Sequence, residues 1–128
     1  MRLLIDTNRY TALASPDQRT LERLQQASEV WLSLITVAEL KSGFAMGSRS
    51  KANERRLEQF IHTQGVGILL PDFETAQYYA DLYKTLRRRG KPIPTNDIWI
   101  ASQALQHNLT LDTLDQHFQL IPKLKLVH

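Results

Sequence analysis

Four acidic residues could perform chemistry together if folding brings them to one place: Asp6, Glu39, Asp97 and Asp115. Two carboxylates about 4 Å apart repel each other by roughly 4 kcal/mol at an effective dielectric constant of about 20. A pocket that gathers four of them must therefore keep some protonated or bind a cation. The chain has no cysteine, and all-oxygen ligation favours Mg²⁺ or Mn²⁺ over Zn²⁺. Such an ion supports attack of water on a phosphodiester.

Strand-like and helix-like segments alternate along the chain. Short apolar runs predict buried strands at 3–5, 30–34, 66–70 and 109–111, with 124–127 as the candidate for a fifth. Apolar residues follow helical spacing at 50–63, 76–86 and 96–108, the last with Asn96 or Thr95 as its N-cap. This alternation predicts the α/β class, with a central, mostly parallel β-sheet of four to five strands flanked by helices.

The predicted topology brings the four acids to one edge of that sheet. Asp6 ends the first strand, and Glu39 lies about one turn into the helix that follows the second. Asp97 opens the helix that leads into the fourth strand, and Asp115 comes just after that strand. Helices that follow or precede parallel strands all begin at the carboxyl edge, where open α/β sheets bind ligands. We therefore expect the four carboxylates to share a pocket there.

Each acid also has an ordinary structural explanation. Asp97 heads the apolar stripe of its helix and could be only a residue that complements the helix dipole. Glu39 could be a surface glutamate, Asp6 a turn residue and Asp115 the N-cap of the short segment after it. Four such explanations that meet on one edge are less economical than one shared site.

Length and composition are those of one small globular domain, residues 1–128. Its residues are 42% hydrophobic and 23% charged, which argues against wholesale disorder, collagen and coiled coil. No apolar run reaches the roughly 18 residues that a membrane span needs. The lack of cysteine fits a reducing compartment. We therefore expect a cytoplasmic protein that makes no membrane contact.

The positive charge is concentrated in one run. The net charge of +3 is too small to indicate a partner, but five basic residues fall within eight positions: Lys84, Arg87, Arg88, Arg89 and Lys91. Such runs commonly keep a helix face solvated. The alternative is contact with phosphate groups, for which Arg87, Arg88, Arg89 and Lys91 are the candidates because they lead towards Asp97.

Four motifs that contain these acids resemble those of the PIN-domain ribonucleases, and most closely the VapC-type toxins of bacterial VapBC toxin–antitoxin modules. They occur in order over essentially the whole chain, as Leu-Ile-Asp-Thr-Asn at 4–8, Ile-Thr-Val-Ala-Glu-Leu at 35–40, Gly-Lys-Pro-Ile-Pro-Thr-Asn-Asp-Ile-Trp-Ile-Ala at 90–101 and Leu-Asp-Thr-Leu-Asp at 111–115. Any one of these motifs is weak evidence, but four in order within 128 residues are specific.

The resemblance implies a PIN-like nuclease domain that cuts RNA endonucleolytically with Mg²⁺ or Mn²⁺ in an acidic pocket. Asp6 and Asp97 would be the firmest metal ligands, with Glu39 and Asp115 assisting through water or a second ion. Thr7, Asn8 and Thr113 would orient ligands or water, although each could instead cap a turn. VapC-type toxins are typically homodimers that a cognate VapB-type antitoxin holds inactive.

Two features depart from this pattern or stand outside it. Asp112 replaces a residue that is usually small and apolar in the family, and we expect it to be exposed at the end of a strand rather than to act as a fifth carboxylate near the metal. The four histidines show no ligand spacing. We expect His117 in particular to be a partly exposed helix residue rather than a phosphate contact.

Two other functional classes compete with the ribonuclease. A non-catalytic RNA- or protein-binding module could use the same fold, and metal-dependent RNA cleavage by the purified protein separates the two. A phosphatase with an aspartate nucleophile could also use Asp6, but that chemistry needs a second acid two residues later, and Asn8 stands there.

Overall fold

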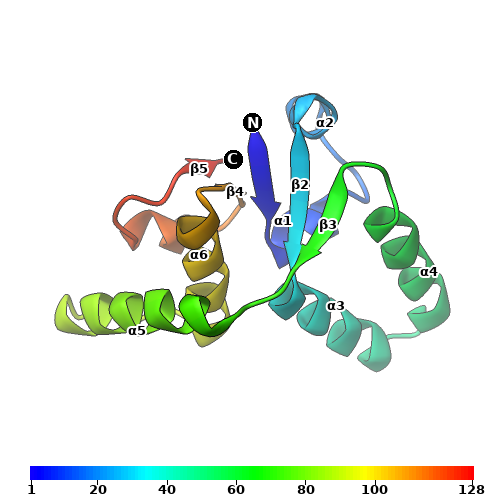
Figure 1. Ribbon diagram of the computed structural model, residues 1–128. Helices are drawn as coiled ribbons and strands as arrows, with labels where there is room; N and C mark the ends of the chain where they lie inside the picture. The colour runs from blue at the N-terminus through cyan, green and yellow to red at the C-terminus, as the bar shows by residue number, and fades with distance from the viewer.

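Five short parallel strands form the centre of the structure, a computed structural model that describes residues 1–128 (Figure 1). They are β1 Arg2–Ile5, β2 Glu29–Ser33, β3 Val66–Leu69, β4 Thr110–Asp112 and β5 Leu126–Val127. Their order across the sheet is β3-β2-β1-β4-β5, and every neighbouring pair is parallel. The predicted α/β class with a parallel central sheet is thereby confirmed.

Helices connect the strands and cover both faces of the sheet. They are α1 Thr7–Ala12, α2 Gln18–Gln26, α3 Leu34–Met46, α4 Ser50–Ile61, α5 Phe73–Arg88 and α6 Thr95–His107, with a 3₁₀ turn, η1, at Gln116–Leu120. Helices α5 and α6 lie on one side of the strands, and α3 and α4 lie on the other (Figure 1). No helix combines the length and apolar character needed to cross a bilayer.

The first strand, β1, lies in the middle of the sheet and contributes side chains to the hydrophobic clusters on both of its faces. Leu4 packs with the apolar side chains of α5 and α6, whereas Ile5 packs with those of α1, α3 and α4. Leu3, Leu4 and Ile5 have no exposed surface. A strand that is buried on both faces reads as a continuous apolar run, which is why residues 3–5 were recognisable in the sequence.

Element boundaries differ from the predictions where a polar cap ends or begins a segment. The strand predicted at 30–34 ends at Ser33, because its hydroxyl accepts from the amide of Ile35 and starts α3. The predicted N-cap of α6, Asn96 or Thr95, is wrong. The helix begins at Thr95 with Pro94 as its N-cap and without a side-chain cap, because the Pro94 carbonyl already accepts from the amides of Asp97 and Ile98.

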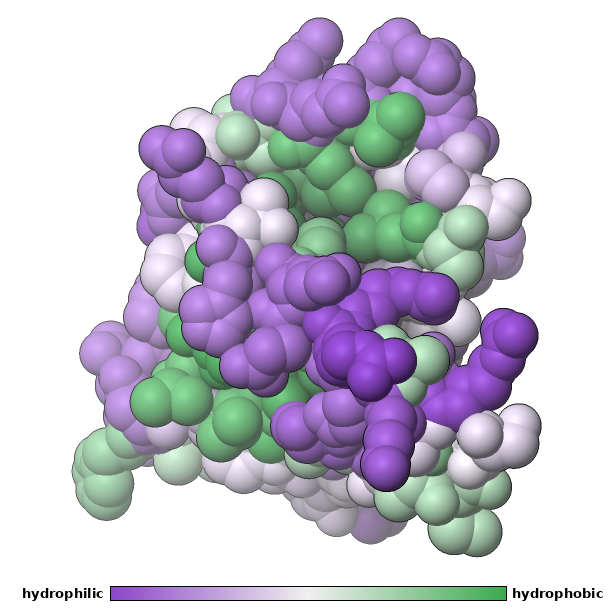
Figure 2. All heavy atoms as spheres, turned by 90° about the vertical axis from the view of Figure 1, so that its right-hand side faces the viewer, coloured by the Kyte–Doolittle hydropathy of each residue, from purple (hydrophilic) through white to green (hydrophobic).

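The side of the molecule on which β3 and α4 lie carries apolar side chains between polar ones (Figure 2). Gly67 of β3 lies opposite Trp31 in the register with β2, and the Trp31 side chain packs against the core cluster formed with α5 and α6. A Cβ atom added to Gly67 would lie 2.8 Å from Cζ3 of the Trp31 indole. The Trp31 ring is held in place, since its Nε1 donates to Oε1 of Glu29 at 2.8 Å.

Replacing Gly67 with alanine should therefore destabilise the protein by about 1–3 kcal/mol, the usual cost of overpacking. Gly43→Ala is the control, because the added Cβ meets nothing within 4 Å and alanine is favoured over glycine inside a helix by about 0.5–1 kcal/mol. Urea unfolding of both variants should show opposite shifts of the midpoint. A Gly67→Ala midpoint no lower than that of the wild type would show that the Trp31 ring moves aside without cost.

Candidate metal centre

The four predicted acids lie in one pocket at the carboxyl ends of the strands. The pocket has a volume of about 320 Å³, and apart from Pro94 its lining side chains are polar or charged. Its walls come from the starts of α1 and α6, one turn of α3, and the segment after β4: Asp6, Thr7, Asn8, Glu39, Pro94, Thr95, Asn96, Asp97, Asp115 and His117. The structure thus brings together residues that are far apart in the chain.

Asp6 is the most deeply placed of the four acids, with only 4% of its surface exposed. Its Oδ1 accepts from the amide of Arg9 at 2.9 Å and thereby caps α1, and its Oδ2 accepts from the hydroxyl of Thr113. Burial raises the pKa of Asp6 above its usual value, these two hydrogen bonds oppose the shift, and the nearby carboxylates of Asp97 and Asp115 add to it.

Hydroxyl groups hold two of the other acids in place. Oγ1 of Thr7 donates to Oε1 of Glu39 at 2.8 Å and joins α1 to α3. The Thr113 hydroxyl that donates to Asp6 also accepts from the amide of Asp115 at 2.9 Å. Asn8 lies on the rim, where it is exposed.

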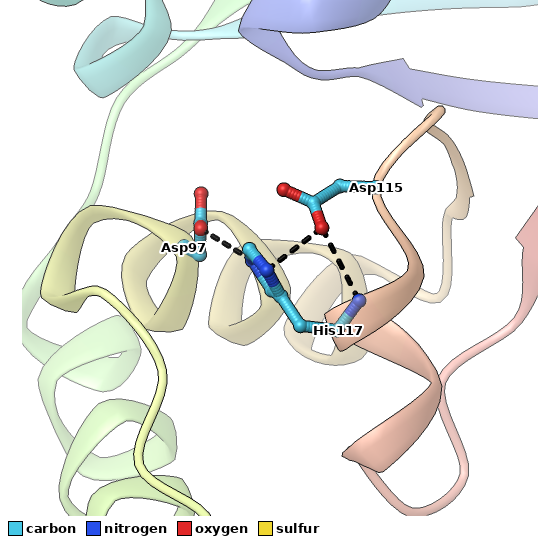
Figure 3. A group of neighbouring side chains, drawn as sticks. All are labelled: Asp97, Asp115 and His117. Carbon is cyan, nitrogen blue, oxygen red and sulfur yellow. Dashed lines mark hydrogen bonds and ion pairs between the residues drawn. The ribbon is translucent and has the colours of Figure 1, made fainter.

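Asp97 and Asp115 flank the ring of His117 (Figure 3). Nε2 of His117 lies 2.6 Å from Oδ2 of Asp97, and Nδ1 lies 2.7 Å from Oδ1 of Asp115. Asp115 also caps η1, because its Oδ1 accepts from the amide of His117 at 3.2 Å. His117 is a partly exposed residue of the 3₁₀ turn η1, as expected, but its ring also lines the acidic pocket, which the spacing of the histidines in the sequence did not indicate.

Asp97 does not act as the side-chain cap of its helix. It lies in the first turn of α6, but that helix has no side-chain cap hydrogen bond, and the carboxylate bonds His117 instead. Burial is the main cause that raises the pKa of Asp97; His117 opposes the shift, and Asp115 and Glu39 add to it. This carboxylate is therefore held where its charge is unfavourable.

Comparison with known proteins identifies the arrangement. The profile of the PIN domain matches residues 3–124. This chain is a PIN domain. Toxin FitB of Neisseria gonorrhoeae is 36% identical to it, over 88% of this chain and 87% of that protein. Ribonuclease VapC1 of Haemophilus influenzae is 33% identical, over 98% of this chain and 96% of that protein.

Solved structures agree with this assignment. The crystal structure of VapBC2 from Rickettsia felis, bound to a DNA fragment from its promoter, superposes with a TM-score of 0.88 at 30% identity, over 99% of this chain and 98% of that chain. The resemblance to VapC-type PIN domains that the four motifs indicate is thereby confirmed.

The basic run of this PIN domain does not line the acidic pocket. Its residues are exposed on the last turns of α5 and in the loop that follows. Arg87 is engaged within its own helix, since its Nη2 donates to the Tyr83 hydroxyl at 2.7 Å and its guanidinium lies 5.1 Å from the centre of that ring.

The expectation that Asp112 is exposed is wrong. Its side chain has no exposed surface and accepts from two arginines, Nε of Arg9 at 2.8 Å and Nε of Arg23 at 2.9 Å. A carboxylate at this depth is tolerated only when it is paired, and the two guanidinium groups supply the pairing. Asp112 does not line the pocket either, so it joins α1 and α2 to β4 as a structural charge.

We therefore predict that Asp112→Val destabilises the protein by about 3–5 kcal/mol, the usual cost of leaving a buried charge without its partner. The double variant Arg9→Leu, Asp112→Val is the matched control. It should recover part of the loss, because Arg23 is then the only guanidinium without its partner. Urea unfolding monitored by circular dichroism measures both; an Asp112→Val midpoint equal to that of the wild type would contradict the structural role.

Proposed function

We propose that this PIN domain is the endoribonuclease toxin of a toxin–antitoxin module and hydrolyses RNA phosphodiester bonds with Mg²⁺ or Mn²⁺ held by Asp6, Glu39, Asp97 and Asp115. The observation that carries the proposal is the meeting of four carboxylates from four separate segments in one pocket without a lysine or arginine in its lining. The relatives called ribonuclease VapC support RNA as the substrate.

The donor set fits a divalent cation. Carboxylate and hydroxyl oxygens are the ligands that Mg²⁺ and Mn²⁺ prefer. The raised pKa values of Asp6 and Asp97 support this, because burial outweighs the hydrogen bonds that stabilise the two charges, and a cation would compensate for the rest. When bound, such an ion lowers the pKa of coordinated water and neutralises charge on the phosphate.

The residues of this chain would orient that chemistry. Thr113 donates to the carboxylate of Asp6 and accepts from the amide of Asp115, so it links the two segments that carry these acids. Thr7 holds Glu39 through its hydroxyl. The exposed Asn8 on the rim is available to a water molecule or to the RNA. These three residues are therefore proposed to position ligands and water.

A cognate VapB-type antitoxin is the proposed protein partner. Structures similar to this chain are toxin–antitoxin complexes, VapBC-1 from nontypeable Haemophilus influenzae and FitAcB from Neisseria gonorrhoeae among them. We also propose that the protein forms a homodimer and acts in the cytoplasm. A purified protein that binds RNA or protein but cleaves no RNA in the presence of metal would instead be a binding module on the same fold.

The basic residues Arg87, Arg88, Arg89 and Lys91 are proposed to bind the RNA backbone outside the pocket. Changing Arg88 and Arg89 to glutamine should lower the slope of log affinity against log salt by about 0.7–0.9 for each phosphate that the protein no longer neutralises. Arg55→Gln with Arg56→Gln on α4 is the control pair with the same loss of charge. If the two double variants lower the slope equally, the change is due to net charge and not to contacts made by Arg88 and Arg89.

The central experiment changes Asp97 to asparagine and follows both stability and RNA cleavage. Because the pKa of Asp97 is raised in the folded protein, its charge destabilises the fold above that pKa, and the cost disappears as the pH falls through it. Without metal at neutral pH, the variant should therefore melt no lower than the wild type. Mn²⁺ or Mg²⁺ should raise the melting temperature of the wild type much more than that of the variant.

Cleavage of RNA by the Asp97→Asn variant should fall at least a hundredfold, which corresponds to about 2.7 kcal/mol of barrier. Glu74→Gln is the matched control, because Glu74 is also an acid in the first turn of a helix but is exposed and outside the pocket. A low melting temperature in chelator, no response to metal and undiminished cleavage would together place the nuclease site elsewhere.

A further inference from the structure

The ring of His117 occupies a position that the four carboxylates alone do not explain. It lies between Asp97 and Asp115, and each ring nitrogen is within 2.7 Å of a carboxylate oxygen. Asp115 directs its other oxygen away from the ring, towards the space beside Asp97 (Figure 3). The ring therefore lies against the same space as two of the proposed metal ligands.

The orientation of this ring is fixed from two directions. Nδ1 is held by Oδ1 of Asp115, the residue that also caps η1. The next residue, Phe118, is fully buried in the core, and its ring centre lies 5.1 Å from that of His117. Asp115 thus holds Nδ1, while Nε2 is directed at Oδ2 of Asp97, itself a proposed metal ligand. Metal-binding imidazoles usually have their second nitrogen held by a carboxylate in this way.

We infer that His117 is a ligand of the metal centre and binds through Nε2, while Nδ1–H donates to Asp115. This inference rests on the proposed function, since it concerns the same ion. One ligand atom each from Asp97, Asp115 and His117 already lie within 4.8 Å of one another. A bound ion would be held by Nε2 of His117 and Oδ2 of Asp97, whose mutual contact it would replace.

A nitrogen ligand changes which ion the centre prefers. Mg²⁺ takes oxygen ligands and retains several of its waters. First-row transition ions bind sites with a nitrogen donor more tightly, in an order that rises from Mn²⁺ through Co²⁺ to Ni²⁺. His117 therefore makes the centre selective for Mn²⁺ or a later transition ion over Mg²⁺, whereas four carboxylates alone would bind both ions in a similar way.

Electron spin echo spectroscopy of the Mn²⁺-loaded wild-type protein tests the inference without any substitution. A coordinated imidazole should give a nitrogen-14 modulation, which changes to nitrogen-15 when only histidine is labelled. Mn²⁺ binding, measured by titration calorimetry, should weaken at least tenfold in His117→Gln, while Mg²⁺ binding changes less than threefold. His62→Gln is the control, because His62 is exposed at the end of α4, outside the pocket.

The outcomes separate this inference from the proposed function. If Mn²⁺ binds with no histidine nitrogen signal, His117 is not a ligand, and the carboxylate centre stands without it. Equal weakening of Mn²⁺ and Mg²⁺ binding in His117→Gln would also overturn the inference, since a residue that only holds Asp97 and Asp115 in place affects both ions. If Mn²⁺ binds neither the wild type nor His62→Gln, the proposed metal centre fails, and the inference fails with it.

Discussion

The carboxylate of Asp6 is the buried charge on which the arrangement of this PIN domain depends. It is nearly inaccessible to water, and desolvation at that depth penalises the charged form unless donors compensate it. Two segments supply those donors, the amide of Arg9 in the first turn of α1 and the hydroxyl of Thr113 beyond β4. One side chain therefore determines both where α1 starts and where the chain must pass after β4.

Asp112 is also a buried acid and lies close to Asp6, but its charge is neutralised within the protein. It is paired with Ile5, the neighbour of Asp6, in the register between β1 and β4. Two guanidinium groups neutralise it from within the protein, whereas the hydrogen-bond donors to Asp6 are an amide and a hydroxyl, and other acids lie near it. The charge of Asp112 is thereby committed to structure, and that of Asp6 is available to a cation from outside.

The sheet and the acidic pocket could be predicted from the sequence because both depend on local patterns. A run such as Leu3–Ile5 is apolar because both of its faces are buried, and the acid that follows it marks the carboxyl edge. The site role of His117 could not be predicted, since its distance from Asp97 depends on the turn geometry of η1. An acid and a histidine two positions apart directly after a strand was the one available signal.

The burial of Asp112 could not be predicted from the sequence for a related reason. Its partners Arg9 and Arg23 precede it by 103 and 89 positions, and no local spacing connects an acid to arginines at such distances. A departure from the family pattern at a strand end was the visible sign. In this fold the departure indicates a pair of charges across the structure rather than an exposed position.

The place of β1 in the middle of the sheet also has a consequence for the order in which the site can be completed during translation. Asp6 is among the first residues synthesised, but Thr113, which donates to it, follows 107 positions later. Until β4 is made, β1 has a free edge on one side, and the pocket lacks the wall that carries Asp115 and His117. A ribosome that is still adding these residues therefore carries a chain in which the acidic pocket is not yet complete.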